Sequence, residues 1–255
     1  MRTFRRMVIL CLVCMLLVPF AACSAEQGEK TLLGIVDLAD IAAVIEAINP
    51  GKYEVITFPT MSEVMAALRS GRVTVAQCTE DYARFMMKLD NSLAFTRSIT
   101  QEVTLSMLAR ESDAELLAAL NVAIETLSEN GTLDALYEQY VTNASLDNVP
   151  DAPPVEVIDG AKTIVVGVSG DMPPHDYVTV DGNPAGYNVA LMGEVAKLAG
   201  FNVKFMPVVL GTKFAALQSE RIDLFFMHMG YTHFEGIVQT IAYADEVYLG
   251  HLSLQ

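Results

Sequence analysis

Two short stretches in the second half of the chain carry side chains with metal-binding or acid–base chemistry. The stretch DMPPHDY holds Asp171, His175 and Tyr177, and the stretch MHMGYTHFE, residues 227–235, holds two histidines and a glutamate. Imidazole and carboxylate groups suit zinc and similar ions. Their spacing matches no standard metal motif, and a strand followed by a loop scatters its side chains. We therefore expect no metal site.

No stretch has the pattern of a catalytic nucleophile. Cys78 stands without a constellation of histidine and asparagine, so we expect it to be a small core residue. The run GVSG at 167–170 lacks the second spacing glycine of a nucleophile elbow. The sequence therefore predicts a protein that is not an enzyme and that needs no cofactor.

The first 23 residues have the pattern of a bacterial export signal. Three arginines precede an apolar run from Met7 to Phe20 that is too short for a comfortable bilayer crossing, and small residues lead to Cys23. The ending FAAC resembles a lipobox, whose cysteine receives lipid, and a plain signal peptide cleaved nearby is the alternative. We predict a signal peptide over 1–22, lipidation at Cys23 and an extracytoplasmic location at the membrane surface.

The charge balance is strongly acidic. The chain has 31 Asp and Glu against 16 Lys and Arg, a net charge of −15. The signal segment holds three of the basic residues and none of the acidic ones, so its removal leaves −18. Such a surface repels phosphates, which argues against nucleic acid as a partner and for membrane contact through lipid. The mature chain keeps only Cys23 and Cys78, which provides no disulfide framework.

Strand-like and helix-like segments alternate on both sides of a proline-rich stretch at 142–161. The segment 61–71, for example, has Val64, Met65 and Leu68 on one helical face and ends at a glycine. This alternation predicts an α/β fold with parallel or mixed sheets. The expected elements lie in 31–51, 52–59, 61–71, 72–78, 81–89, 99–110, 112–141, 162–170, 187–200, 201–209, 213–220, 221–229 and 241–255.

Two long stretches closely resemble the first lobe of the type 3 extracellular solute-binding proteins, the amino-acid receptors of bacterial uptake transporters. They are VVGVSGDMPPHDYVTVDGNPAGYNVALMGEVAKLAGFNVKF and FAALQSERIDLFFMHMGYT. TMSEVMAALRSGRVTVAQ and LLAALNVAIETLSENGTLDALYEQYV resemble that family's second lobe and closing helices. The resemblance implies a two-lobed periplasmic-binding-protein-like fold of type II, a small solute between the lobes, and an ABC permease in the membrane as partner.

The order of these parts is reversed relative to the family. We expect a spacer at 23–30, lobe two at 31–110, closing helices at 111–141, a linker at 142–161 and lobe one at 162–255. A circularly permuted single module is favoured, because one copy of each lobe permits a complete core. A tandem remnant, made of half of one module and half of the next, is the alternative. A permuted chain would have only the stretch near 99–110 between its lobes, which predicts a loose hinge.

The residues that clamp an amino acid in this family are missing here. Glu235 stands where the resemblance implies an arginine for the α-carboxylate, and Thr79 stands where it implies an aspartate for the ammonium group. The stretch GIVDLADIA has no counterpart of the family's Gly-Thr-Thr loop. An ordinary amino acid is therefore not the expected ligand, and a cation or a neutral polar solute is favoured.

The remaining candidate ligand-binding residues come from both lobes. Tyr177 and Tyr187 either pack at the edge of the cleft with their hydroxyls in water or stack on the ligand. The full set is Asp171, His175, Tyr177, Tyr187, His228, Tyr231, Thr232 and Glu235 from lobe one, and Thr79 and Glu80 from lobe two.

The resemblance and the missing clamp residues together leave two functions open. The leading one is a lipid-anchored solute-binding protein of an ABC-type uptake system. The alternative is a degenerate module that keeps the fold and acts as a regulatory or protein-interaction partner, which the missing clamp residues favour.

Overall fold

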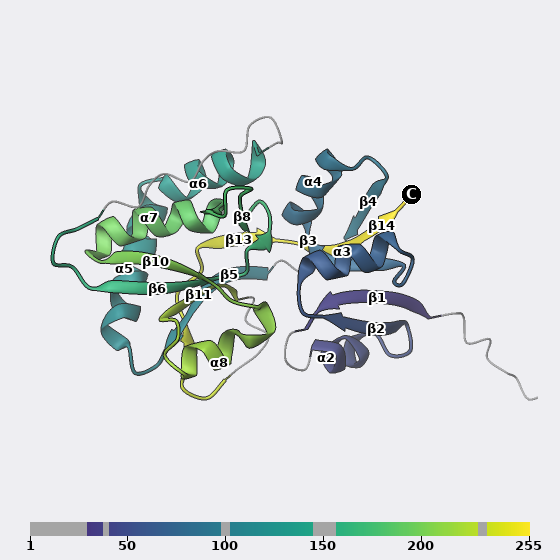
Figure 1. Ribbon diagram of the computed structural model, residues 1–255, viewed down its shortest axis with the longest axis horizontal. Coiled ribbons are helices and arrows are strands. Elements are labelled where there is room, and N and C mark those ends of the chain that lie inside the picture. The colour runs from purple at the N-terminus through teal and green to yellow at the C-terminus, as the bar shows by residue number, and fades with distance from the viewer. Residues whose placement is uncertain (1–29, 38–40, 98–102, 145–156, 229–233) are drawn as a thin grey trace, which may run out of the picture. The chain divides into compact units, whose positions relative to one another are not determined.

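Two β-sheets organise the chain in the computed structural model, which describes residues 30–37, 41–97, 103–144, 157–228 and 234–255 (Figure 1). The predicted signal segment, the lipidation position Cys23 and most of the predicted linker lie outside the described residues. Residues 31–255 form one compact unit. Within the described ranges no helix is both long and apolar enough to cross a membrane.

A five-stranded sheet is built mostly from the first half of the chain. Its strand order is β2-β1-β3-β14-β4; β1 runs parallel to β2 and β3, and β14 runs antiparallel to β3 and β4. Helices α2, α3 and α4 follow β1, β2 and β3 along the chain (Figure 1). The bounds are β1 Thr31–Val36, α2 Ile41–Ile48, β2 Tyr53–Phe58, α3 Met61–Arg69, β3 Val75–Thr79, α4 Glu80–Leu89, β4 Leu93–Arg97 and β14 Leu249–Leu254.

A six-stranded sheet takes most of the second half. Its order is β10-β6-β11-β5-β12, with β13 also paired to β5. A three-stranded sheet, β7-β8-β9, precedes α7. The bounds are β5 Val103–Arg110, α5 Ala114–Glu129, α6 Thr132–Tyr137, the π-helix η1 Glu138–Thr142, β6 Thr163–Val168, β7 Asp171–Met172, β8 Asp176–Val178, β9 Pro184–Ala185, α7 Tyr187–Ala199, β10 Asn202–Pro207, the 3₁₀-helix η2 Leu210–Thr212, α8 Lys213–Gln218, β11 Leu224–His228, β12 Ile237–Gln239 and β13 Ala244–Val247.

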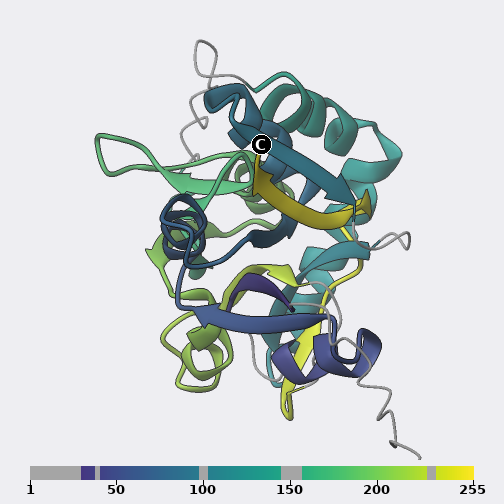
Figure 2. The same ribbon diagram turned by 90° about the vertical axis from the view of Figure 1, so that its right-hand side faces the viewer.

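The C-terminal strand corrects one prediction from the sequence. The predicted lobe one includes residues 249–254, but they form β14 between β3 and β4 of the other sheet, as the yellow strand in Figure 2 shows. The chain therefore passes between the sheets from β13 to β14 as well as from β4 to β5. The expectation of a single covalent crossing near 99–110 is wrong, because an extended pattern in a sequence does not say which sheet receives the strand.

Local sequence explains the elements that frame the site. The hydroxyls of Thr60 and Thr79 accept hydrogen bonds from the first turns of α3 and α4, which fixes where both helices begin. Gly131 adopts φ 76° between α5 and α6, so the predicted break at this glycine is confirmed. Helix α7 is apolar on most faces and is buried along most of its length, against α5 and α6.

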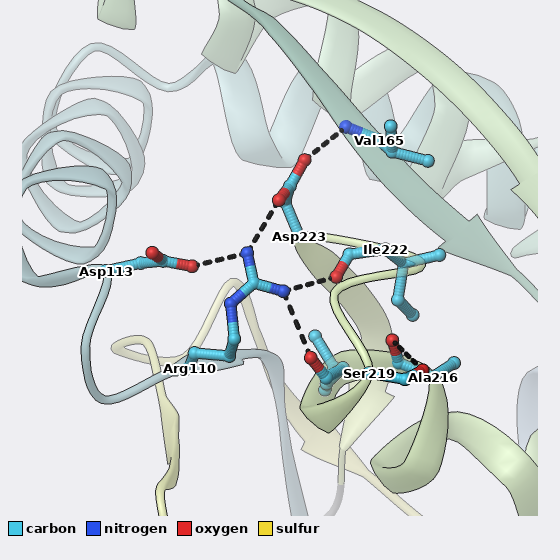
Figure 3. Close-up of polar contacts among 8 residues, drawn as sticks. Arg110, Asp113, Val165, Ala216, Ser219, Ile222 and Asp223 are labelled. Atoms are coloured by element: carbon cyan, nitrogen blue, oxygen red, sulfur yellow. Dashed lines mark hydrogen bonds and ion pairs between the residues drawn. The ribbon is translucent and has the colours of Figure 1, made fainter.

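Arg110 fixes the end of β5, the first strand after the crossing. Its guanidinium lies 2.6 Å from an oxygen of Asp223 and 2.7 Å from one of Asp113, and it donates to the carbonyls of Leu217 and Ile222 at 3.1 and 2.6 Å (Figure 3). The other carboxylate oxygen of Asp223 accepts a hydrogen bond from the amide of β6 residue 165 at 2.8 Å. One arginine thus ties β5 to β6 and to the turn before β11.

Candidate functional site

Polar side chains from the two sheets meet at Asp81. The imidazole Nε2 of His175 lies 3.1 Å from Asp81 Oδ2, and the hydroxyl of Tyr137 donates to the same oxygen at 2.6 Å. Asp81 belongs to α4 beside the five-stranded sheet, whereas Tyr137 and His175 come from elements beside the six-stranded sheet. We call Asp81, Tyr137, His175 and Tyr187 the junction, because the ring of Tyr187 packs edge-on against His175 at 5.9 Å and against Tyr137 at 5.6 Å.

A buried network positions His175. Asp176, which follows it, is fully buried and accepts hydrogen bonds from the Ser169 hydroxyl, the Gly170 amide at 2.8 Å and the Asn188 side chain at 3.1 Å. Burial raises the pKa of Asp176, and these hydrogen bonds oppose the shift. The loop that carries His175 is therefore held from both sides, by β7 and β8 and by the start of α7.

Gly186 brings the start of α7 against the same loop. Its φ is 105°, and a Cβ at this position would lie 2.6 Å from the carbonyl oxygen of His175. The amides of Tyr187 and Asn188 donate to the carbonyls of Pro174 and His175 at 3.1 and 2.8 Å. A glycine is required at this close approach, which sets Tyr187 beside the imidazole.

Asp81 is held in its charged form. Burial alone would raise the pKa of its carboxyl, but hydrogen bonds and charge from His175, together with the Tyr137 hydroxyl, lower that pKa below its usual value. Burial and the neighbouring Asp81 raise the pKa of Tyr137, so this phenol stays neutral. An ionised carboxylate only accepts, so its hydrogen bond with His175 requires a proton on Nε2. The Nδ1 atom of His175 is buried and has no hydrogen-bond partner within the described ranges.

A second polar contact joins the two sheets beside the junction. The amide of Ser62 in the first turn of α3 donates to Oδ2 of Asp171 at 3.0 Å. The first turns of α3 and α4 therefore both meet the segment 171–175, one through its backbone and one through Asp81. A carboxylate at a helix N-terminus is electrostatically favoured.

Two pockets share Tyr137 as a wall. The first, of about 530 Å³, we call the arginine-lined pocket; its lining includes Glu80, Asp81, Arg84, Lys88, Arg97 and Tyr248. The second, of about 460 Å³, we call the acidic pocket; its lining includes Asp134, Glu138, Tyr187 and Tyr243.

The charges of the arginine-lined pocket are already paired. Glu80 lies 2.6 Å from Arg84 and 2.5 Å from Arg97, and the guanidinium of Arg97 stacks over the Tyr248 ring at 3.7 Å. Hydrogen bonds from Arg97 lower the pKa of Glu80, and those from Arg84 act in the same direction.

Lys88 of the same pocket donates to the carbonyls of Thr142 and Ala144 at 3.2 and 2.6 Å.

The structure brings some of the predicted site residues together. His175 and Tyr187 lie in the junction, Asp171 contacts α3 beside it, and Glu80 lines the arginine-lined pocket. Tyr187 is 1% exposed and its hydroxyl donates to the Tyr243 carbonyl at 3.3 Å, so the expectation of a hydroxyl in water is wrong for this residue.

The other predicted residues lie elsewhere or outside the described ranges. Thr79 is buried and its hydroxyl caps α4. Tyr177 is partly buried in β8, and Glu235 is exposed. Tyr231 and Thr232 lie outside the described residues, as does the side chain of His228, whose backbone is in β11.

Sequence reasoning missed Tyr137 and gave Asp81 no role. Asp81 directly follows the candidates Thr79 and Glu80, so its position at the start of a helix was a usable signal. No sequence signal pointed to Tyr137, since its contact with Asp81 spans 56 positions.

Cys78 is a buried free thiol whose pKa is raised by burial, consistent with a core residue. No group of three or more potential metal ligands occurs among the residues that the structure describes.

Comparison with known families supports the predicted resemblance. Residues 164–234 match the model for bacterial extracellular solute-binding proteins, family 3. The matched segment includes Asp171, His175 and Tyr187. No curated protein sequence matches the chain.

Solved structures show the fold. The tungstate ABC transporter from Geobacter sulfurreducens aligns with a TM-score of 0.51 and 13% identity over 89% of this chain and 85% of that one. This confirms an α/β fold of the two-lobed, periplasmic-binding-protein-like type.

Two further solved structures are less similar. A zinc-bound ligand-binding component of an ABC-type import system from Staphylococcus aureus has a TM-score of 0.47 and 13% identity over 89% of this chain, which spans 66% of that protein. The Bordetella pertussis BvgS VFT2 domain has a TM-score of 0.41 and 13% identity over 88% of this chain and 80% of that one. Likeness at this level carries no argument about function.

Proposed function

We propose that this protein is a lipid-anchored, extracytoplasmic solute-binding protein of an ABC-type uptake system, and not an enzyme. The observation that carries the proposal is that Tyr137 and His175 both contact one carboxylate oxygen of Asp81. Asp81 belongs to a helix beside the five-stranded sheet, whereas the other two residues come from elements beside the six-stranded sheet. In a two-lobed receptor, polar groups that meet when the lobes close are the ones that hold a solute. The permease would recognise the closed arrangement, and lipid at Cys23 would keep the receptor at the membrane.

The chemistry of the junction favours a cation or a neutral polar solute. Asp81 and Asp171 provide carboxylates, Tyr137 a hydroxyl and His175 an imidazole, and none of the junction residues is a lysine or an arginine. A solute carboxylate would find no unpaired guanidinium to bind it with two hydrogen bonds, because Arg84 and Arg97 of the neighbouring arginine-lined pocket are already paired with Glu80. A polar solute with hydrogen-bond donors would instead replace His175 and Tyr137 as partners of Asp81.

A single permuted module is the organisation we propose. The five-stranded sheet contains β14 from the second half of the chain, and the six-stranded sheet contains β5 from the first half. Two half-modules that fold separately would not exchange strands in this way. The passages from β4 to β5 and from β13 to β14 supply two crossings around which the lobes would close.

A ligand screen tests the proposal. The mature chain, without residues 1–22, is mixed with millimolar polyols, sugars, amines, amides and amino acids, and thermal unfolding is followed with an external dye because the chain has no tryptophan. A true ligand raises the unfolding temperature through binding to the folded state. Asp81→Asn should abolish the shift and the exposed Glu125→Gln should keep it. Failure of every solute class to stabilise the wild-type chain would contradict the proposal.

The interaction-module alternative is favoured by one observation. His175 and Tyr137 already provide hydrogen bonds to Asp81, and Ser62 already provides one to Asp171, so these acceptors are satisfied by the protein itself. If this is the working state, a membrane pull-down with the anchored chain should recover a stoichiometric protein partner that is insensitive to added solutes. A solute that releases such a partner would favour the receptor function.

A further inference from the structure

Two residues stand where the chain crosses from one sheet to the other. Arg97 is the last residue of β4, after which the chain continues to β5 of the six-stranded sheet. Tyr248 is the single residue between β13, which ends at position 247, and β14, which begins at position 249. They belong to different crossings, so a contact between their side chains links the two crossings to each other.

The side chains of Arg97 and Tyr248 are in direct contact. The central guanidinium carbon of Arg97 lies 3.7 Å from the centre of the Tyr248 ring, as in a stacked cation–π pair. The register of the sheet favours this contact, because Arg97 pairs with Gly250 and residue 248 is the diagonal neighbour two positions earlier. The arginine side chain is 48% exposed, so the stack alone would link the crossings only weakly.

Glu80, at the start of α4, bonds to both residues. One oxygen of its carboxylate lies 2.5 Å from Nε of Arg97, and its backbone amide donates to the carbonyl of Tyr248 at 2.8 Å. The Glu80 side chain is only 12% exposed, and hydrogen bonds from Arg97 lower the pKa of its carboxyl, so it is ionised. Three residues that contact one another in this way form a network, which stabilises more than an isolated surface ion pair does.

We infer that Arg97, Tyr248 and Glu80 form a hinge bridge, which makes the two crossings move together and limits how far the lobes open. The inference rests on the proposed function in one respect, since it takes the two sheets to be the lobes of a receptor that closes. Hinges are formed by a few residues at the ends of elements, and both crossing residues have such positions. A twist of one lobe against the other would slide the crossings past each other and break the stack.

The hinge bridge changes what we expect of the lobe motion. A single strand between the lobes would give a loose hinge, whereas two strands fastened to each other bend about one shared axis. None of the three residues belongs to the junction, so a change in the hinge bridge leaves the side chains of the junction in place. The stiffness of the hinge can therefore be varied separately from the solute contacts.

The experiment measures the distance between two spin labels, one on each lobe, by pulsed electron paramagnetic resonance. The labels are attached at Glu54→Cys in β2 and Glu125→Cys in α5, both exposed positions, in the mature chain with Cys23→Ser. The remaining thiol, Cys78, is buried, and the label stoichiometry checks that it stays unmodified. We expect one narrow distance distribution for this labelled parent chain.

Two substitutions in the labelled parent remove the stack from either side. Arg97→Gln removes the cation, and Tyr248→Leu removes the ring but keeps the backbone carbonyl that Glu80 contacts. Each should broaden the distance distribution at least twofold, because the crossings can then move separately. The double variant should broaden it no further than the larger single effect, since both substitutions remove one shared contact.

Arg84→Gln is the matched control. Arg84 pairs with the same carboxylate at 2.6 Å, but it lies within α4, its side chain is 67% exposed, and it belongs to neither crossing. Its replacement removes one positive charge beside Glu80, as Arg97→Gln does, and should leave the distribution unchanged. Circular dichroism and thermal melts establish that each variant is folded.

Three results would overturn the inference. The first is a distribution in the folded Arg97→Gln and Tyr248→Leu variants that is as narrow as that of the parent. The second is equal broadening by Arg84→Gln, which would assign the effect to the charge of Glu80. The third is additive broadening in the double variant, which would indicate two unrelated effects.

The label distances are measured without any solute, so they test the hinge bridge separately from the receptor function. Broadening in both crossing variants, together with a ligand screen that finds no stabilising solute, would support the hinge bridge and contradict the receptor function. Unchanged distances in these variants, together with a stabilising solute, would overturn the hinge bridge and support the receptor function.

Discussion

Asp81 and His175 are 94 positions apart in the chain, yet a carboxylate oxygen of the first lies 3.1 Å from an imidazole nitrogen of the second. The imidazole is fully buried, and the carboxylate side chain is 16% exposed. This contact joins α4, beside one sheet, to the loop between β7 and β8, beside the other. Its strength therefore bears on how firmly the two halves of the proposed receptor hold together.

Removal of this contact should destabilise the protein measurably. Asp81→Asn replaces a charged acceptor of two hydrogen bonds with a neutral amide, and we expect a loss of about 2 kcal/mol in the free energy of unfolding. His175→Gln should cost a similar amount. The double variant should lose less than the sum of the two, because both remove one shared interaction. Urea unfolding of the four proteins measures this coupling, and strict additivity would contradict it.

The stability difference between wild type and Asp81→Asn should depend on pH. The folded-state pKa of Asp81 is lowered, so its contribution is fully present above the unfolded value near 3.8 and is lost as pH falls through the folded pKa. The difference should stay constant from pH 7 to pH 5 and shrink below pH 4. Unfolding titrations at matched ionic strength check this, and a difference that grows on acidification would refute the assigned direction.

The arginine at the end of β5 should be needed for stability. Arg110→Ala leaves Asp113 and Asp223 without their shared cation, and we expect a loss of about 3 kcal/mol. Arg110→Lys should recover only part, because an ammonium group cannot bond two carboxylates and two carbonyls in one plane. Arg69→Ala is the control. The guanidinium of Arg69 lies 3.6 Å from Asp90, and the arginine side chain is 49% exposed, so its removal should change the free energy of unfolding by less than about 0.5 kcal/mol.

The close approach at Gly186 gives another test. An alanine there would place a Cβ 2.6 Å from the His175 carbonyl oxygen at φ 105°, so we expect Gly186→Ala to cost about 2 kcal/mol or more. Gly182 also has positive φ, 82°, but has open space around it. Gly182→Ala should therefore cost about 1 kcal/mol, the backbone part alone. Equal losses in the two variants would show that the contact with His175 does not matter.

Local patterns in the sequence predict much of this fold. The break at Gly131, the apolar strand that became β11 and the helical face of α3 all follow from residues near each other in the chain. Contacts between residues far apart in the chain cannot be predicted in this way. Nothing near residues 249–254 indicates that they insert between β3 and β4, and Tyr137 gives no sign that it faces Asp81. The buried hydroxyl of Tyr187 was unexpected for the same reason, since its acceptor is the distant Tyr243 carbonyl.

Replacement of Lys213 should stabilise the protein, whereas the substitutions above should destabilise it. Its side chain is buried at the start of α8, near the rings of Phe214 and Phe225, and it forms no ion pair with any described carboxylate. Burial lowers the pKa of this lysine to about 8, so the folded state carries an electrostatic penalty that is full below pH 8 and disappears above the ordinary value of 10.5. Lys213→Met, which keeps a long flexible side chain, should raise the free energy of unfolding by roughly 2 kcal/mol at pH 7. The gain should shrink between pH 8 and pH 10, whereas Lys204→Met at an exposed position of β10 should show neither effect. A loss of stability on Lys213→Met at pH 7 would mean that the ammonium group is compensated.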